Sequence, residues 1–240
     1  MSAESPHYAG QELDVFAHAA RWKRYWSSLL TPLLAGDVLE VGAGIGATTL
    51  ALAGDRARSW TCLEPDARLA RRLRETLDRA LPGDYRYRVQ VGGLDAVAPT
   101  SRFDTILYID VLEHISDDRR EAERAAGHLH PGGRLVVLAP AHQFLFSAFD
   151  RAIGHHRRYS RKTLAACTPD GCVLERLIYL DGMGLLASLA NRLLLRQATP
   201  ALGQIRFWDR VLVPVSARID PLLGHRVGKS ILGVWRKHPA

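Results

Sequence analysis

The sequence predicts an α/β protein whose helices cover both faces of one doubly wound sheet. Short apolar runs alternate with helix-forming segments through most of the chain, and this alternation is typical of strand–helix–strand units in such sheets. One apolar run ends at Val41 and leads into a glycine cluster and then into a further helix-forming segment. That order indicates a strand, a tight turn and the beginning of a helix. The 240 residues, 47% of them hydrophobic, are enough to bury the core of one large domain.

Seven strands are predicted, and we expect a parallel sheet. The strands lie near residues 37–41, 59–63, 86–91, 103–109, 133–139, 172–180 and 230–235. Helices are predicted between them near residues 46–54, 66–80, 117–129 and 160–167.

The predicted organisation has four parts. Residues 1–36 are an N-terminal helical cap and residues 37–180 are the core of the sheet. Residues 181–228 are a helical insertion, rich in Leu, Arg and Trp, and residues 229–240 supply the last strand and a tail. Because ligands of open α/β sheets bind at the carboxyl ends of the strands, we expect the insertion to cover that edge.

The net charge of +7 conceals an asymmetry. Residues 1–150 hold 17 basic and 20 acidic side chains, whereas residues 151–240 hold 15 basic and 5 acidic ones. A basic C-terminal third is compatible with nucleic acid, with an anionic membrane surface or with an anionic small molecule. The first is not expected, because neither zinc-finger spacing nor an aromatic RNA-binding signature appears in the sequence.

We expect a cytoplasmic protein. The N-terminal residues are polar and acidic and do not resemble a secretory signal. The longest apolar run near the C-terminus, residues 183–190, is shorter than the roughly 20 residues that cross a bilayer. Cys62, Cys167 and Cys172 lie in or beside apolar segments without metal-ligand spacing, which predicts buried thiols in a reducing compartment.

The glycine cluster admits two cofactors. Gly42, Gly44 and Ala47 match a dinucleotide fingerprint, with Glu64 following at the distance of a ribose-binding acid. The same loop, from Glu40 to Gly46, also fits the pattern E-x-G-x-G-x-G of proteins that bind S-adenosylmethionine (SAM). The loop alone leaves both open.

Three downstream motifs favour SAM. "TCLEPD" (61–66), "VGGLDAV" (91–97) and "FDTILYIDVLEHISD" (103–117), which leads into "LHPGGRLVVLAP" (129–140), follow in order. Over residues 38–140 the chain resembles the class I SAM-dependent methyltransferases, in the branch with ubiquinone-pathway O-methyltransferases and natural-product methyltransferases. The resemblance implies a Rossmann-like seven-stranded fold, SAM as cofactor, and methyl transfer to a small or lipid-like acceptor. We make no prediction of the oligomeric state.

The resemblance also implies a cofactor site. The loop would lie under the methionine part of SAM, Glu40 would meet its ammonium, and Glu64 would accept hydrogen bonds from the ribose hydroxyls. Asp95 would accept from the adenine amino group, and Ile109 would flank the sulfonium. The expected cofactor-binding residues are Glu40, Gly42, Ala43, Gly44, Gly46, Glu64, Pro65, Asp95 and Ile109.

The stretch "DVLEH" (110–114) has three interpretations. By resemblance, Asp110, Glu113 and His114 would hold Mg²⁺, with Asp110 standing where the family has Glu. Alternatively His114, with Glu113, acts as a general base or orients the acceptor without a metal. In the third interpretation these residues only begin the next helix.

The stretch "DRAIGHHRRYSRKTL" (150–164) is the predicted acceptor-binding loop. In one interpretation Arg157 and Arg158 grip a phosphate, diphosphate or carboxylate, beside His155 and His156. In the other, Arg158 and Tyr159 brace the loop and Ser160 caps the following helix. Further candidates are Tyr159 for catalysis and Tyr25 for acceptor binding.

Leucines recur at helical spacing in the insertion, from Leu185 to Leu194, and Phe207, Trp208, Val211 and Leu212 follow beside arginines. They predict either packing on the core or a face resting on a membrane. For the whole chain, the alternatives to a methyltransferase are an NAD-dependent dehydrogenase, a SAM-binding regulator and a non-methylating pericyclase.

Overall fold

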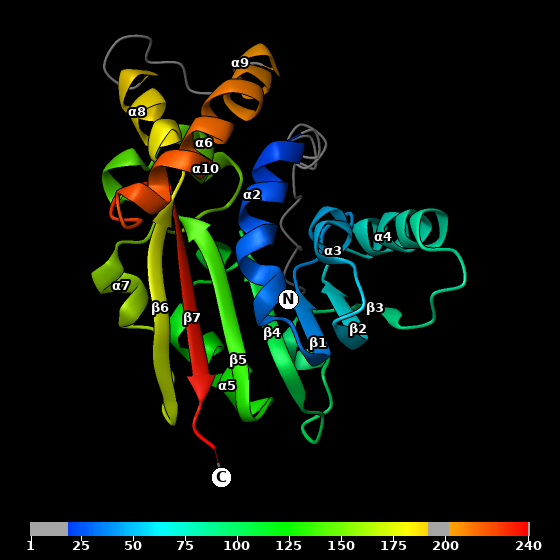
Figure 1. The fold of residues 1–240 in the computed structure, drawn as a ribbon. Helices are drawn as coiled ribbons and strands as arrows, with labels where there is room; N and C mark the ends of the chain where they lie inside the picture. Colours follow the sequence, from blue (N-terminus) through cyan, green and yellow to red (C-terminus); the bar gives the residue numbers. More distant parts are fainter. Residues whose placement is uncertain (1–18, 192–201, 240) are drawn as a thin grey trace, which may run out of the picture.

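The computed structural model describes residues 19–191 and 202–239, and they contain one seven-stranded sheet (Figure 1). Its strand order is β3-β2-β1-β4-β5-β7-β6. The strands are β1 (Gly36–Val41), β2 (Ala57–Glu64), β3 (Tyr87–Val91), β4 (Phe103–Ile109), β5 (Leu129–Pro140), β6 (Cys172–Leu180) and β7 (Ser230–Lys237). All seven predicted strands are therefore confirmed, with ends shifted by a few residues.

The expectation of a wholly parallel sheet is wrong at β7. This strand runs antiparallel to both β5 and β6, so the sheet is mixed. The reason lies in the insertion: β6 ends at Leu180, and Ser230 at the start of β7 pairs with it. A chain that stays at the carboxyl edge between the two strands can re-enter the sheet only in the reverse direction.

Helices form one layer on each face. The first layer contains α2 (Ala20–Leu30), α3 (Ala47–Leu52) and α4 (Ala67–Ala80), and the second contains α5 (Asp118–Gly127) and α7 (Arg161–Ala165). Alternate residues of β4 serve the two layers, because Leu107 and Ile109 join one core cluster while Ile106 and Tyr108 join the other. This alternation is the period of two that a strand buried on both faces requires.

The insertion is helical where the structure describes it. It comprises α8 (Gly182–Ala190), α9 (Leu202–Phe207), a π-helical turn (Trp208–Leu212) and α10 (Val213–Leu222). These helices lie beyond the carboxyl ends of the strands, beside α2 (Figure 1). Leu193 and Leu194 of the predicted leucine stripe lie outside the described residues.

Short polar contacts tie α2 to the insertion. The backbone N–H groups of Arg21 and Trp22 donate to Asp209, and the Tyr25 hydroxyl donates to Asp220 at 2.8 Å. Among the described helices, none is long and apolar enough to cross a membrane. The three cysteines are buried free thiols, as predicted.

Candidate functional site

The glycine loop links β1 to α3 and needs its glycines for two reasons. Gly42, Gly44 and Gly46 have φ values of +71°, +58° and +89°, which residues with a Cβ rarely adopt. A Cβ on Gly42 would also lie 2.6 Å from a methyl carbon of Val111, and one on Gly46 would lie 2.7 Å from a methyl carbon of Leu73. The loop is therefore a fixed cradle that a larger residue would deform.

Glu64 ends β2 and holds this loop from beneath. Its Oε2 accepts a hydrogen bond from the backbone N–H of Gly44 at 2.8 Å, and its Oε1 accepts one from Asp66 at 3.0 Å. Burial raises the pKa of the Glu64 carboxyl, although these two donors oppose the shift. Each carboxylate oxygen keeps a second lone pair, so Glu64 can brace the loop and still accept from a ligand.

The carboxyl group of Glu40, which was expected to meet the ammonium of the cofactor, is buried in the core. Its Oε2 accepts from the hydroxyl of Thr49 at 2.7 Å and from the indole N–H of Trp60 at 2.8 Å, whereas its Oε1 is buried without a partner among the described atoms. Burial raises its pKa to about 7. The structure thus shows Glu40 holding α3 against the sheet, and its predicted contact with a ligand ammonium stays a prediction.

The other predicted cofactor residues surround the same edge. Ala43 is buried and donates its N–H to Leu63, Ile109 is almost buried at the end of β4, and Pro65 and Asp95 are exposed after β2 and β3. They follow the ends of adjacent strands, where a ligand lying across the loop would meet them.

Asp110 follows β4 in a left-handed conformation, with φ +54°. Its side chain reaches solvent, yet enough protein surrounds it for desolvation to raise its pKa to about 6, against the opposing charges of His155, Lys229 and Arg158. The charges of Lys23 on α2 and of Lys229, which precedes β7, also act on Asp110 and oppose the rise of its pKa.

A cluster of three residues, Glu113, His114 and His155, lies next to Asp110. The carboxyl group of Glu113 is fully buried, and neither of its oxygens has a hydrogen-bond partner among the described atoms. His155 places Nε2 at 3.8 Å from Glu113 Oε1 and Nδ1 at 3.0 Å from Asp150 Oδ1. The rings of His114 and His155 meet edge to face with centroids 4.5 Å apart.

The protonation of this cluster follows from its burial. Burial, and then the charge of Asp110, raise the pKa of Glu113 well above its ordinary range. Burial and the neighbouring His155 lower the pKa of His114 to about 4, so its imidazole is neutral at pH 7. Potential ligand atoms of Glu113, His114 and His155 all lie within 4.8 Å of one another. Asp110 is not a member of that group, and the metal set of Asp110, Glu113 and His114 stays a prediction.

The basic loop is braced internally. Arg157 pairs with Asp118 at 2.6 Å and donates to the carbonyl of Ser116, and Arg158 pairs with the buried Asp150 at 2.8 Å. Because both guanidinium groups already have carboxylate partners, the anion grip predicted for them loses its basis. His156 is exposed, and its backbone N–H donates to the carbonyl of Glu113.

Tyr159 is part of the same bracing. Its hydroxyl donates to Asp118 at 2.8 Å and is buried, and burial raises its pKa far above the ordinary value. Ser160 caps α7 through a capping box with Thr163, as the bracing interpretation predicted. Because its hydroxyl is buried and already bonded to Asp118, Tyr159 is a poor proton donor or acceptor for a substrate, and the structure does not support its predicted catalytic role.

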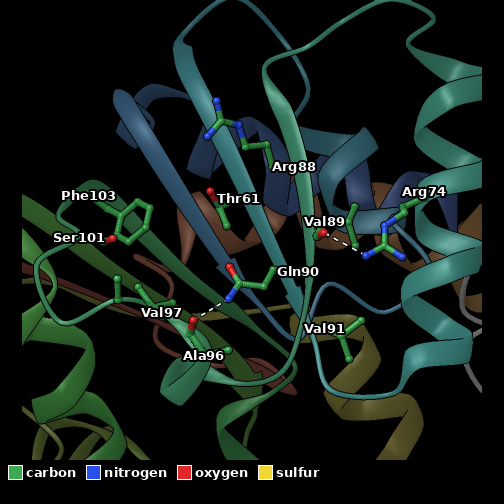
Figure 2. Close-up of a pocket in the computed structure, with 11 residues that line it drawn as sticks. Thr61, Arg74, Arg88, Val89, Gln90, Val91, Ala96, Val97, Ser101 and Phe103 are labelled. Atoms are coloured by element: carbon green, nitrogen blue, oxygen red, sulfur yellow. Dashed lines mark hydrogen bonds between the residues drawn. The ribbon is translucent and has the colours of Figure 1, made fainter.

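A hollow of about 640 Å³ lies elsewhere, at the β3 edge of the sheet (Figure 2). Its lining includes Thr61, Arg88 and Gln90, and the Gln90 amide donates to the carbonyl of Ala96. The hollow contains neither the glycine loop nor Asp110 nor the three-residue cluster, so we do not assign the cofactor to it.

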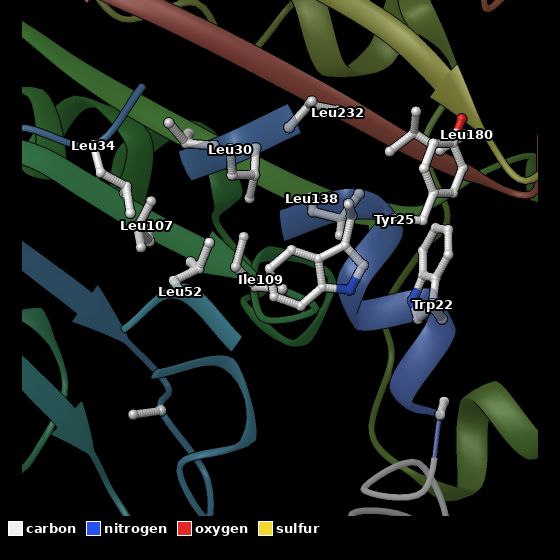
Figure 3. Close-up of a cluster of buried hydrophobic side chains, with 14 of the residues drawn as sticks. Trp22, Tyr25, Leu30, Leu34, Leu52, Leu107, Ile109, Leu138, Leu180 and Leu232 are labelled. Carbon is white, nitrogen blue, oxygen red and sulfur yellow. The ribbon is translucent and has the colours of Figure 1, made fainter. Parts of the chain in front are cut away.

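Tyr25 is buried beside Trp22, in the apolar cluster that also contains Leu180 (Figure 3). With its hydroxyl bonded to Asp220, it joins α2 to the insertion instead of reaching an acceptor, which corrects its predicted role. Sequence reasoning also missed Lys23, Lys229 and Asp150. The only signal for Asp150 was its place three residues after Ser147, where a capping box forms.

Comparison with known proteins gives consistent matches. A family model described as a methyltransferase domain matches residues 39–135, from β1 into β5. Demethylmenaquinone methyltransferase from Tropheryma whipplei (strain Twist) is 32% identical over 133 residues, covering 55% of this chain and 54% of that protein. Ubiquinone biosynthesis O-methyltransferase from Xylella fastidiosa (strain 9a5c) is 32% identical over 151 residues, covering 55% and 60%. The chain spans little more than half the length of these relatives.

Among solved structures, that of the [4+2]-cyclase SpnF superposes with a TM-score of 0.63 at 15% identity, covering 100% of this chain and 98% of that chain. At such low identity the likeness establishes the fold alone.

Proposed function

We propose that this chain is a class I SAM-dependent methyltransferase and that it transfers a methyl group from SAM to a small acceptor that is partly apolar and anionic. The observation that carries the proposal is a convergence at the carboxyl edge of the sheet. There the Glu64-braced glycine loop, Asp110 with its raised pKa and the cluster of Glu113, His114 and His155 follow the ends of neighbouring strands.

The cofactor would occupy the glycine loop. SAM, when bound, supplies an electrophilic methyl group on a sulfonium. The loop suits SAM, which carries no phosphate, because the Glu64 carboxylate keeps lone pairs that can accept from the ribose hydroxyls. Asp95 would meet the adenine and Ile109 would flank the sulfonium. Glu40 would support the loop from inside the core.

The three-residue cluster would serve the acceptor. A neutral His114 can take the proton of an acceptor hydroxyl as that oxygen attacks the methyl carbon, and His155, held by Asp150, would keep the neighbouring ring in place. Displacement at carbon leaves S-adenosylhomocysteine. Much of the acceleration would come from holding nucleophile and methyl group in line.

A metal is the second possibility for the same cluster. The unpartnered carboxylate of Glu113 beside two imidazoles suits Zn²⁺, Mn²⁺ or Fe²⁺ better than Mg²⁺, which prefers oxygen ligands. Such an ion would lower the pKa of an acceptor hydroxyl. Two measurements separate the metal hypothesis from the base hypothesis. The metal hypothesis requires a bound ion in the purified protein, and the base hypothesis requires full turnover after chelation.

The acceptor's charge would be met by Lys23, whose charge acts on Asp110 and whose pKa is lowered by burial. The charge of Lys229 also acts on Asp110, but like Arg157 and Arg158 it already has a carboxylate neighbour. Lys229 Nζ lies 3.8 Å from Asp181 Oδ2 and 3.9 Å from the centre of the Trp208 ring.

We propose that the reaction takes place in the cytoplasm.

Calorimetry with SAM tests the cofactor assignment. We expect SAM to bind and NAD(H) not to bind, and Glu64→Ala to weaken SAM by about 1.5–3 kcal/mol, as for hydrogen bonds to a charged group. Glu64→Gln, which keeps one acceptor, should lose less, and the exposed Glu75→Ala is the control. Binding of NAD(H) alone would support the dehydrogenase. Release of S-adenosylhomocysteine with quinol-type acceptors separates a methyltransferase from a SAM-binding regulator or a pericyclase.

A further inference from the structure

The charges of the insertion are sorted by depth. Its three acids are buried: Asp209 receives the N–H groups of α2, and Asp181 and Asp220 are fully inaccessible. Its arginines in the described residues are all exposed, namely Arg206, Arg210, Arg218 and Arg226. The outside of the insertion therefore carries only positive charge where the structure describes it.

The same helices expose large apolar side chains. Phe207, Val211 and Leu222 are 56%, 45% and 84% accessible, and Leu186 of α8 is also exposed. Their neighbours Ile205, Trp208 and Val213 pack into the core, so the helices have already used one face for packing. The exposed side chains Phe207, Val211, Leu222 and Leu186 belong to neither of the two core clusters.

We propose that this outer face, made of Arg206, Phe207, Arg210, Val211, Arg218 and Leu222, rests on the surface of an anionic lipid bilayer. Arginines attract anionic headgroups, and apolar side chains beside them enter the boundary with the acyl chains. Both kinds of side chain are needed for that contact, and both are present on the same helices.

Other occupants fit the face less well. A second copy of the chain docked through the same face would set arginine against arginine, since a twofold interface brings identical patches together. Nucleic acid would account for the arginines but would leave Phe207 and Leu222 without a role.

The position of the face connects it with the catalytic edge. The insertion lies beyond the carboxyl ends of the strands (Figure 1), and a side-chain nitrogen of Arg21 on α2 donates to the carbonyl of Arg210. A bilayer held there would lie at the carboxyl edge of the sheet and supply apolar acceptors to it. Membrane binding is nevertheless measured without turnover, so it stands or falls independently of methyl transfer.

Co-sedimentation with vesicles tests the proposal, using phosphatidylcholine alone and phosphatidylcholine mixed with phosphatidylglycerol. We expect binding to the mixed vesicles that weakens with salt. Arg210→Gln/Arg218→Gln should bind about 30-fold less tightly, since each basic residue near such a surface contributes about fivefold. Phe207→Ser/Leu222→Ser should also bind less tightly.

The controls lie on a distant part of the molecule. Arg71→Gln on α4 and Tyr85→Ser, whose ring is 91% accessible, should bind as the unaltered protein does, and unchanged thermal unfolding shows that each variant is folded. The proposal is overturned if the unaltered protein ignores the mixed vesicles, or if the outer-face variants bind like the controls. Self-association abolished by Phe207→Ser/Leu222→Ser without vesicle binding would assign the face to a second copy.

Discussion

Two buried carboxylates at the carboxyl edge of the sheet, Asp181 in the insertion and Glu113 in the three-residue cluster, differ in their hydrogen bonding. In the insertion, Asp181 accepts from the Trp208 indole N–H at 2.7 Å, the Ser216 hydroxyl at 2.8 Å and the Gly184 backbone N–H at 3.0 Å. In the three-residue cluster, the equally buried Glu113 accepts from no described donor.

The difference in hydrogen bonding separates a carboxylate that stabilises the fold from one that is available for chemistry. Leaving a buried polar group without partners costs about 1–3 kcal/mol, so folding alone gives no reason to keep Glu113 in that state. A satisfied carboxylate such as Asp181 fixes the insertion above the sheet, and an unsatisfied one is available to a proton, an acceptor or a metal.

The largest expected effect comes from His114. If it is the general base, His114→Gln should lower kcat/KM by about 10²–10⁴-fold with SAM affinity unchanged. A base acts only when deprotonated, and the pKa of His114 is lowered to about 4, so kcat/KM should stay level from pH 8 down to pH 5. A fall centred near pH 6 would instead assign the base to Asp110, whose pKa is about 6.

Matched amide substitutions compare the two groups directly. Asp181→Asn places an NH₂ group against donors, so the free energy of unfolding should fall by about 2–4 kcal/mol and Tm by about 5–15 °C. Glu113→Gln meets no donor at either oxygen, so its Tm should be unchanged or higher while turnover falls. Equal losses of Tm in both variants would show that the two carboxylates are alike.

The residues predicted for the cofactor lie in local motifs, whereas those predicted for the acceptor depend on tertiary packing. Gly42 and Gly44 come directly after β1, and Glu64 and Ile109 are the last residues of β2 and β4, so the local pattern predicts where each of them lies. The partners of the basic loop are set by tertiary packing. Arg157 pairs with Asp118, which lies 39 positions earlier in the chain, at the start of α5. Lys229 comes near Asp110 because the insertion returns the chain to this edge of the sheet.

The basic loop offers the next test. Arg158→Gln removes the partner of the buried Asp150, so stability should fall by about 1.5–3 kcal/mol. SAM affinity should change little, because the glycine loop is untouched. Lys162→Gln, at an exposed site on α7, is the control in thermal unfolding. A raised KM for an anionic acceptor with normal Tm would restore the anion grip.

Glu40 is intermediate between the two groups, because one of its oxygens is satisfied and the other is not. Its pKa is about 7 in the folded chain and near 4.5 unfolded, so the native state binds more protons between these values. Stability therefore falls as pH rises from about 4.5 to 7, and the loss persists above.

Glu40→Gln should remove that dependence and raise stability at pH 8 by on the order of 1–2 kcal/mol, the smallest effect expected here. The amide oxygen can still accept from Thr49 and Trp60, and the NH₂ group replaces the unpaired oxygen. Urea unfolding at pH 5 and pH 8 measures the change. If SAM instead binds much more weakly to this variant, with the stabilisation absent, then the unpaired oxygen meets the ammonium of the cofactor. Glu40 would in that case belong with Glu113 among the groups kept for chemistry.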